Sequence, residues 1–245
     1  MDELRVYPNV TPVYLDVRKP DSCQSLADLV GKDGGSLDGL VNVAGIVQNG
    51  PACGFNDEQI QLLFDVNTFG PMRLCRMLIP IMLRTERGGS IVNVTSVGGK
   101  VAWPWSGNYS PSKAALNLFS DSVRREAKAN NLPIRISVVA PGAVQTPLVH
   151  AFVDNLRAWL SKNPTSPFAP GVKAEAEFLG ALQEYGLGTS SVAIDPKIVA
   201  DTVMDVLNDP NPSTYYLVAT FGFKIIYYLA LYLPTCLADR VLLSV

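Results

Sequence analysis

Residues 91–96 read Ile-Val-Asn-Val-Thr-Ser, and residues 108–115 read Asn-Tyr-Ser-Pro-Ser-Lys-Ala-Ala. The first stretch is a short apolar, β-branched run, which predicts a buried strand ending near Ser96. The second opens a pattern that predicts a helix over residues 109–129. Tyr109 and Lys113 are four positions apart, so on a helix they lie on one face and can point into the same cleft. The two stretches therefore predict a strand followed by a helix, with polar groups where they meet.

Acid–base chemistry is the function that this pair indicates. A tyrosine phenol has an ordinary pKa of about 10. A nearby ammonium favours the phenolate, so we expect Lys113 to lower the pKa of Tyr109 toward neutral pH. The phenol could then give a proton to an alkoxide or take one from an alcohol, while Ser96 hydrogen-bonds the same oxygen. Taken alone, such a pair is more often a solvated helix face, so other motifs must agree with it.

Short Val/Ile/Leu runs alternate with longer helical patterns along the rest of the chain. The runs show little polar alternation, which is typical of a parallel sheet covered on both faces. Strands are predicted at residues 12–17, 40–43, 91–95, 134–139 and 214–220. Helices are predicted at residues 25–30, 58–84, 109–129 and 195–208. This order predicts an α/β fold, a doubly wound parallel (Rossmann-like) sheet with ligands at the carboxyl ends of its strands.

Composition limits the function classes. The chain has 245 residues, of which 48% are hydrophobic, and its net charge is −2. We expect one catalytic domain over residues 1–220 and no nucleic-acid partner, because no Lys/Arg run is present. The single histidine, His150, excludes a His-rich metal site and disfavours a Ser-His-Asp hydrolase, so no metal is expected. Four cysteines without C-x-x-C spacing, and no signal peptide, indicate an intracellular, cytoplasmic protein.

Two later segments carry weaker predictions. Residues 146–191 contain three closely spaced prolines and are interpreted as a substrate-covering lobe, or as a surface insertion without a role. The apolar stretch over residues 214–233 is interrupted by Gly222 and Lys224, which leaves a helix over residues 223–233 that is too short to span a membrane. The apolar extension over residues 221–245 could lie on a membrane surface, cover a hydrophobic substrate mouth or form a dimer contact.

Five motifs in order resemble those of the short-chain dehydrogenase/reductase family, over residues 15–220. They are Leu-Asp-Val at residues 15–17, Leu-Val-Asn-Val-Ala-Gly at 40–45, Val-Asn-Thr-Phe-Gly at 66–70, the triad of Ser96, Tyr109 and Lys113, and Pro-Gly-Ala-Val-Gln-Thr at 141–146. Val43 stands where the family usually has a second Asn. Each motif alone is weak, and their agreement in order and spacing makes the resemblance specific.

The resemblance implies a mechanism and a set of contacts. Ser96 would orient a carbonyl oxygen, Tyr109 would donate the proton, Lys113 would hold the nicotinamide ribose, and Asn67 would hold a water that relays protons. The cofactor-binding residues that it implies are Asp16, Val17, Asn42, Ala44, Gly45, Tyr109, Lys113, Pro141, Gly142, Val144 and Thr146.

Several of these residues have structural alternatives. Asn42 could cap a strand end, and Asn67 could bend the predicted helix over residues 58–84. Ser110 and Ser112 are interpreted as packing or capping neighbours. Trp103 and Trp105 could line an apolar substrate pocket or fill the core.

One family element is absent from the sequence. Members normally begin with a strand and a Gly-rich turn that seats the cofactor pyrophosphate on a helix N-terminus. We therefore expect an N-terminally shortened form that lacks the first β-α-β segment, with the edge of residues 40–43 exposed and residues 12–17 without a neighbouring strand. Such a chain should bind its cofactor weakly. It could be catalytically weak or inactive and act as an association partner through the helices at residues 58–84 and 109–129.

The apolar C-terminus resembles, more loosely, that of fungal 1-acyldihydroxyacetone-phosphate reductases. This resemblance implies a small lipophilic ketone or alcohol as substrate and favours NADP(H) over NAD(H). It also implies contact with the endoplasmic reticulum or a lipid droplet. The short-chain dehydrogenase/reductase resemblance implies a homo-oligomer, because the helices at residues 58–84 and 109–129 usually form a dimer interface in that family. A steroid or retinoid dehydrogenase is the alternative within enzymes.

Overall fold

The structure is a computed structural model that describes residue 4 and residues 6–184 and 193–243. Its centre is a four-stranded sheet in the order β1-β2-β3-β4, and all three pairings are parallel. The strands are β1 (Gly39–Asn42), β2 (Gly89–Val94), β3 (Ile134–Pro141) and β4 (Tyr215–Val218). The predicted α/β fold with a parallel sheet is confirmed.

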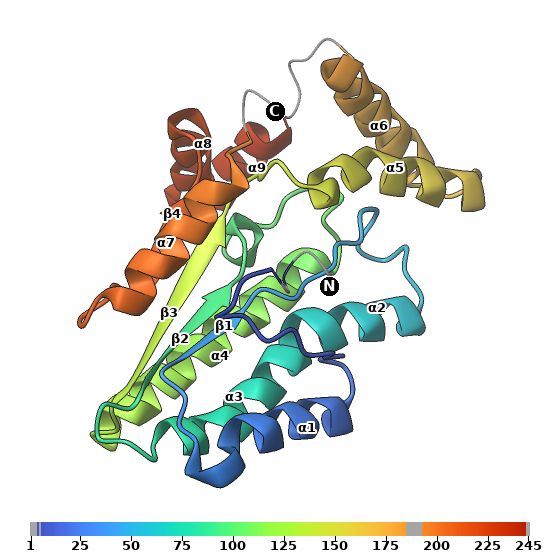
Figure 1. Cartoon of the computed structure of the whole chain (residues 1–245). Coiled ribbons are helices and arrows are strands. Elements are labelled where there is room, and N and C mark those ends of the chain that lie inside the picture. Colours follow the sequence, from blue (N-terminus) through green and yellow to red (C-terminus); the bar gives the residue numbers. More distant parts are fainter. Residues whose placement is uncertain (1–3, 5, 185–192, 244–245) are drawn as a thin grey trace.

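Helices cover both faces of this sheet (Figure 1). The helices α1 (Pro20–Gly31), α3 (Gly70–Met82) and α4 (Tyr109–Ala129) lie on one side, and α7 (Pro196–Asn208) lies on the other. Successive side chains of β2 point to opposite faces of the sheet, so they pack against different helix layers. Ile91 packs in a cluster with Ala127 of α4, whereas Val92 packs with Val203 of α7. The doubly covered sheet explains why its strands lack polar alternation.

Local sequence sets the start of two helices. Asp195 accepts a hydrogen bond from the Lys197 N–H at 2.7 Å, and Pro196 is the first residue of α7, as predicted. The helix α2 (Asp57–Phe64) begins with a capping box, in which Asn56 and Gln59 exchange side-chain-to-backbone hydrogen bonds of 2.9 and 3.0 Å. The short 3₁₀ helices are η2 (Lys32–Gly34) and η4 (Val97–Gly99).

The strand predicted at residues 12–17 is wrong. Residues 11–16 form no regular structure. A strand needs a partner for its backbone groups, and the described residues place β2 beside one edge of β1 and no strand beside the other. The segment instead runs toward α3, where Val17 is buried and its carbonyl accepts a hydrogen bond from Arg73 Nη1 at 3.1 Å.

The single helix predicted at residues 58–84 is also wrong, because it is divided into three elements. A π-helical turn, η3 (Asp65–Phe69), separates α2 from α3. Pro71 follows the π turn directly and lies in the first turn of α3, and its missing N–H takes one hydrogen bond out of this continuous helical stretch. Single π turns inside helices are frequent at functional sites, and this one contains Asn67.

The predicted lobe contains two helices, α5 (Pro147–Lys162) and α6 (Ala169–Glu184), which pack against each other. Residues 185–191 of the predicted lobe lie outside the described residues. Trp159 of α5 donates to the Gly54 carbonyl at 3.0 Å, so the pair is fastened to the loop that follows β1. Figure 1 shows α5 and α6 beyond the carboxyl ends of the strands.

The C-terminal segment forms α8 (Phe221–Tyr232) and α9 (Thr235–Leu243), and the last two residues of the predicted extension lie outside the described part. Among the described residues, every helix is too short or too polar to cross a bilayer.

Candidate active site

Ser96 and Tyr109 meet where β2 ends and α4 begins. Ser96 is the N-cap of η4, and its hydroxyl oxygen accepts a hydrogen bond from the Gly98 N–H at 3.1 Å. The Tyr109 side chain is hydrogen-bonded to Ser96. The structure therefore brings together the hydroxyl and the phenol that the sequence placed on separate elements.

Lys113 lies one helical turn further along α4 and is almost completely buried, with 3% of its surface exposed. Its ammonium donates to the Val94 carbonyl at 3.3 Å and lies 5.9 Å from the centre of the Tyr109 ring. Burial lowers the pKa of Lys113 to about 8, because the charged form loses hydration.

The expected lowering of the Tyr109 pKa is wrong. Burial raises the pKa of Tyr109, and the hydrogen bond with Ser96 opposes this only in part. Desolvation acts on both groups, since Tyr109 is half-buried, Lys113 is buried, and the ammonium is turned toward the Val94 carbonyl. The phenol therefore keeps its proton at neutral pH, which suits a proton donor.

Asn67, which lies in the π turn, connects this turn to the loop after β1 and to α4. Its side chain is fully buried and forms two 2.9 Å hydrogen bonds with the backbone N–H and carbonyl of Ile46. It also donates to the Ser112 hydroxyl at 3.1 Å. A Cβ added to Gly45 would lie 3.3 Å from the Lys113 ammonium and 3.5 Å from the Asn67 oxygen. The loop after β1, the π turn and α4 thus converge at one point.

Ser112 is a site residue that the sequence reasoning interpreted only as packing or capping. Its hydroxyl donates to the Tyr109 carbonyl at 2.7 Å while it accepts from Asn67. The Thr68 hydroxyl donates to the Ser112 carbonyl at 2.9 Å. The spacing of three residues between Tyr109 and Ser112 was the available signal, because such positions share a helix face.

The predicted nicotinamide-side residues follow β3. Pro141 is the last residue of the strand, and the Gly142 N–H donates to the Val218 carbonyl at 2.9 Å. Val144 forms a bridge with Ile194, and the Thr146 hydroxyl donates to the Val144 carbonyl at 3.3 Å. These contacts hold the segment at the same edge of the sheet as Ser96.

The residues after β1 divide into an inward and an outward group. The Asn42 side chain is buried and donates to Asn93 at 2.8 Å, and Asn93 donates to Ser120 at 2.8 Å. The Asn42 side chain thus links β1 to β2 rather than capping a strand end, and its contact with a cofactor stays a prediction. Ala44 and Gly45 are exposed, so their backbones lie open to a ligand.

Asp16 already has a partner. Its carboxylate accepts hydrogen bonds from the Arg18 N–H at 3.1 Å, from Nε at 2.9 Å and from Nη2 at 2.8 Å. The Arg18 side chain holds the pKa of Asp16 at about 2. A ligand that used this carboxylate would have to share it with Arg18.

Apolar side chains of Trp103 and of the C-terminal helix α8 lie beside the site. Trp103 packs on Phe223 of α8 with ring centroids 5.3 Å apart, and Phe223 also lies beside Gly142. Trp105 instead packs against Gly171 of α6, so it fills the lobe interface. The two tryptophans therefore differ: Trp103 lies beside the site, whereas Trp105 fills a core.

The site fits a nicotinamide nucleotide at the end nearest Lys113. Gly45 places no side chain against the Lys113 ammonium, and the buried hydroxyls of Thr95 and Ser110 have no hydrogen-bond partner among the described residues. These are polar groups that a ligand could satisfy. At the other end, Asp16 is engaged by Arg18 and the sequence contains no Gly-rich turn. The part of the chain that is described holds no group of three His, Cys, Asp or Glu residues placed for a metal.

A parallel α/β sheet with Ser, Tyr and Lys near its carboxyl edge is an arrangement that suits a nucleotide-dependent oxidoreductase. A family profile described as "short chain dehydrogenase" matches residues 2–157. The chain belongs to this family of oxidoreductases.

Its relatives cover several activities. It is 32% identical to retinol dehydrogenase 5 of Homo sapiens over 93% of this chain and 71% of that protein. It is also 32% identical to the 3-oxoacyl-[acyl-carrier-protein] reductase FabG of Thermotoga maritima over 65% of this chain and 64% of that one. A short-chain dehydrogenase/reductase from Burkholderia phymatum, solved in complex with NAD, has the same fold, with a TM-score of 0.73 and 24% identity over 94% of this chain and 78% of that one.

Proposed function

We propose that the protein interconverts a lipophilic ketone and its alcohol, with NADP(H) as the hydride carrier and Tyr109 as the acid and base. The observation that best supports this is the convergence of Ser96, Tyr109 and Lys113 on one edge of the sheet. Asn67 is held near these three residues by its hydrogen bonds with Ile46 and Ser112.

Each residue has a distinct role in this proposal. A bound nicotinamide supplies or accepts the hydride. Ser96 orients the substrate oxygen, and Tyr109 donates its proton to that oxygen during reduction. Lys113 binds the nicotinamide ribose, and Asn67 positions a water that returns protons to Lys113. General acid catalysis of this kind contributes about 10²–10⁴-fold.

The proposed cofactor contacts extend from the predicted residues on both sides of the triad. Asp16, Val17, Asn42, Ala44 and Gly45 form the adenine and ribose side. The nicotinamide side is formed by Pro141, Gly142, Val144 and Thr146. A fluorescence titration with NADPH and, separately, NADH tests this assignment, and tighter binding of NADH would reverse the choice of cofactor.

We base the proposed substrate class on the apolar side chains that Trp103 and α8 place beside the site. Among lipophilic ketones we propose 1-acyldihydroxyacetone phosphate, with a retinoid or steroid as the alternative. The 32% identity to retinol dehydrogenase 5 supports the alternative. Turnover of an acyl-dihydroxyacetone phosphate but not of retinaldehyde would favour the first substrate.

We further propose that residues 1–220 act as one catalytic domain, with residues 146–191 as its substrate lobe and residues 221–245 as a peripheral membrane contact. The exposed fractions of Phe221 (81%) and Tyr232 (77%) support a contact with the endoplasmic reticulum or a lipid-droplet surface. Vesicle flotation with wild type and Phe221→Ser tests the contact. Size-exclusion chromatography with light scattering tests the proposed homo-oligomer.

An association partner without activity is the second candidate function. It is favoured by the engagement of Asp16 by Arg18 and by the absence of a Gly-rich turn from the sequence. Co-purification with a longer homologue, without ketone turnover, would support this candidate over the enzyme.

The deciding experiment follows NADPH oxidation by the purified chain with a panel of lipophilic ketones. Wild type should turn over a member of the panel, and Tyr109→Phe should not. Tyr7→Phe is a matched control, because Tyr7 is 59% exposed. Equal turnover by wild type and Tyr109→Phe would refute the proposed role of the phenol.

A further inference from the structure

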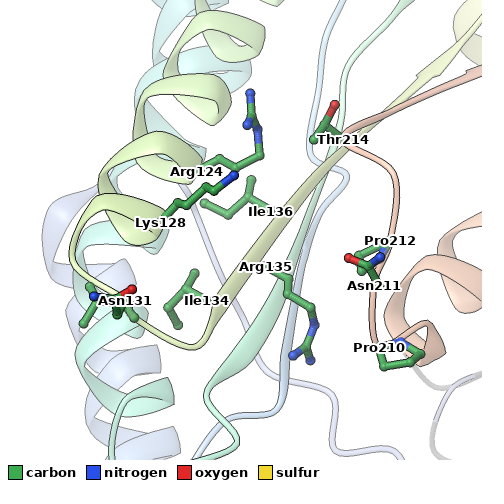
Figure 2. Close-up of a pocket in the computed structure, with 11 residues that line it drawn as sticks. Arg124, Lys128, Asn131, Ile134, Arg135, Ile136, Pro210, Asn211, Pro212 and Thr214 are labelled. Carbon is green, nitrogen blue, oxygen red and sulfur yellow. The ribbon is translucent and has the colours of Figure 1, made fainter.

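A cavity lies at the opposite end of the sheet from the candidate catalytic groups (Figure 2). It has a volume of about 430 Å³ and lies between the last turns of α4, the start of β3 and the loop that joins α7 to β4. The strand β3 runs from Ile134 at this cavity to Pro141 at the catalytic edge. At about 3.3 Å per residue, the two sites are separated by roughly 20 Å.

Three cationic side chains line this cavity, although the chain as a whole is slightly acidic. Arg124 and Lys128 come from α4, and Figure 2 shows Lys128 extending from the helix toward Ile136. Arg135 comes from β3, where its Nε donates to the Ser90 hydroxyl at 3.0 Å. Asp121 pairs with Arg124 at 2.9 Å and also with Arg125, so one carboxylate offsets only part of this charge.

Backbone N–H and C=O groups without a partner strand face the same space. The pairing of β3 with β4 begins at Val138, whose N–H donates to the Thr214 carbonyl at 3.0 Å. Backbone groups alternate between the two edges of a strand, so those of Ile134 and Ile136 point to the same edge as those of Val138. The register of β4 leaves that edge of Ile134 and Ile136 without a partner strand.

Neutral donors complete the lining. Figure 2 shows Asn211 and Thr214 across the cavity from α4, and Asn131 lies at the end of the helix. Guanidinium and ammonium groups with amide N–H groups favour phosphate or carboxylate oxygens, because the hydrogen bonds are charge-assisted. The cavity is larger than one such group requires and falls within the size range of small-molecule sites.

We propose that this cavity binds a small organic polyanion that carries two or more phosphate or carboxylate groups. Lys128 and Arg124 bind one anionic group at the helix end. Arg135 and the free edge of β3 bind the other. This site is separate from the cofactor position and does not depend on the proposed reaction.

Isothermal titration calorimetry with the full chain tests the proposal, with pyrophosphate and citrate as separate probes. Ionic strength is held constant with NaCl, since exposed charges are screened over about 10 Å at 0.1 M salt. We expect at least one probe to bind, and the probe that binds distinguishes phosphate from carboxylate. Lys128→Gln and Arg135→Gln should each weaken that binding about tenfold, the change that about 1.4 kcal/mol produces.

Two control variants locate the binding. Arg125→Gln removes a cation from α4 that does not line the cavity, and it should change the affinity by less than about twofold. Lys113→Met alters the catalytic site and should leave the affinity unchanged. The proposal is overturned if neither probe binds, if Lys128→Gln and Arg135→Gln bind like wild type, or if Lys113→Met abolishes the binding. Circular dichroism of each variant checks that the fold is retained.

Discussion

Replacing Lys113 by methionine should stabilise the folded protein at neutral pH. Burial lowers the pKa of Lys113 from its ordinary 10.5 to about 8, which means that the fold disfavours the charged ammonium. At about 1.4 kcal/mol per pH unit, this lowering corresponds to a cost of about 3 kcal/mol at pH 7. The hydrogen bond to the Val94 carbonyl offsets about 1 kcal/mol of that cost. Lys113→Met should therefore be about 2 kcal/mol more stable than wild type at pH 7.

The sign of the pH dependence follows from the same lowering. Between pH 8 and pH 10.5 the unfolded lysine keeps its proton while the folded one has lost it. The unfolded state then binds more protons, so the contribution of Lys113 to stability rises with pH. The advantage of Lys113→Met should accordingly shrink by about 3 kcal/mol across this interval.

Urea unfolding at pH 7, 8, 9 and 10, followed by circular dichroism, measures this difference. Other groups titrate in the same range, but they are common to both proteins and largely cancel in the comparison. Lys173→Met is the matched control, because Lys173 is 69% exposed and its substitution should change the stability little. A stability difference for Lys113→Met that stays constant or grows with pH would refute the assignment of a desolvated ammonium.

Three further substitutions test the site. Tyr109→Phe should lower ketone turnover by about 10²–10⁴-fold and affect NADPH binding far less, and stopped-flow assays and fluorescence titration read these two effects separately. Asn67→Ala should lower the free energy of unfolding by about 1–3 kcal/mol, because it leaves the Ile46 backbone groups unpaired; an unchanged urea midpoint would contradict this. Gly45→Ala should weaken NADPH binding, since the new methyl would lie 3.3 Å from the Lys113 ammonium; equal dissociation constants for the variant and wild type would show that the cofactor does not approach this loop.

The sequence predicted best where local pattern and burial agree. The helix from Tyr109 to Ala129 has the predicted bounds, because a long periodic segment is decided by its own residues. The segment at residues 12–17 has strand-like composition but no partner, and pairing is a property of the whole sheet. The direction of the Tyr109 pKa also lay beyond the sequence, since spacing places Lys113 nearby but does not show how much water both groups lose.

The π turn at residues 65–69 could not be predicted either, because it also depends on contacts far away in the sequence. Periodicity cannot distinguish a continuous helix from one that contains a single wider turn, and the polar contacts of Asn67 come from residues 21 and 45 positions away. The Asp16–Arg18 pair, by contrast, spans two residues and could have been foreseen as a competitor for a ligand.

The π turn gives the helical stretch one residue that it could lose without changing direction. A wider turn accommodates an additional residue, so deleting one residue between Asp65 and Phe69 would let an ordinary helix run straight through. Because the wide turn takes up the additional residue, its removal would leave the side chains of α3 facing nearly the same way relative to α2. The buried stripe of α3, including Leu74 and Leu78, would stay turned toward the core, and the damage would fall on the contacts that Asn67 makes from the turn.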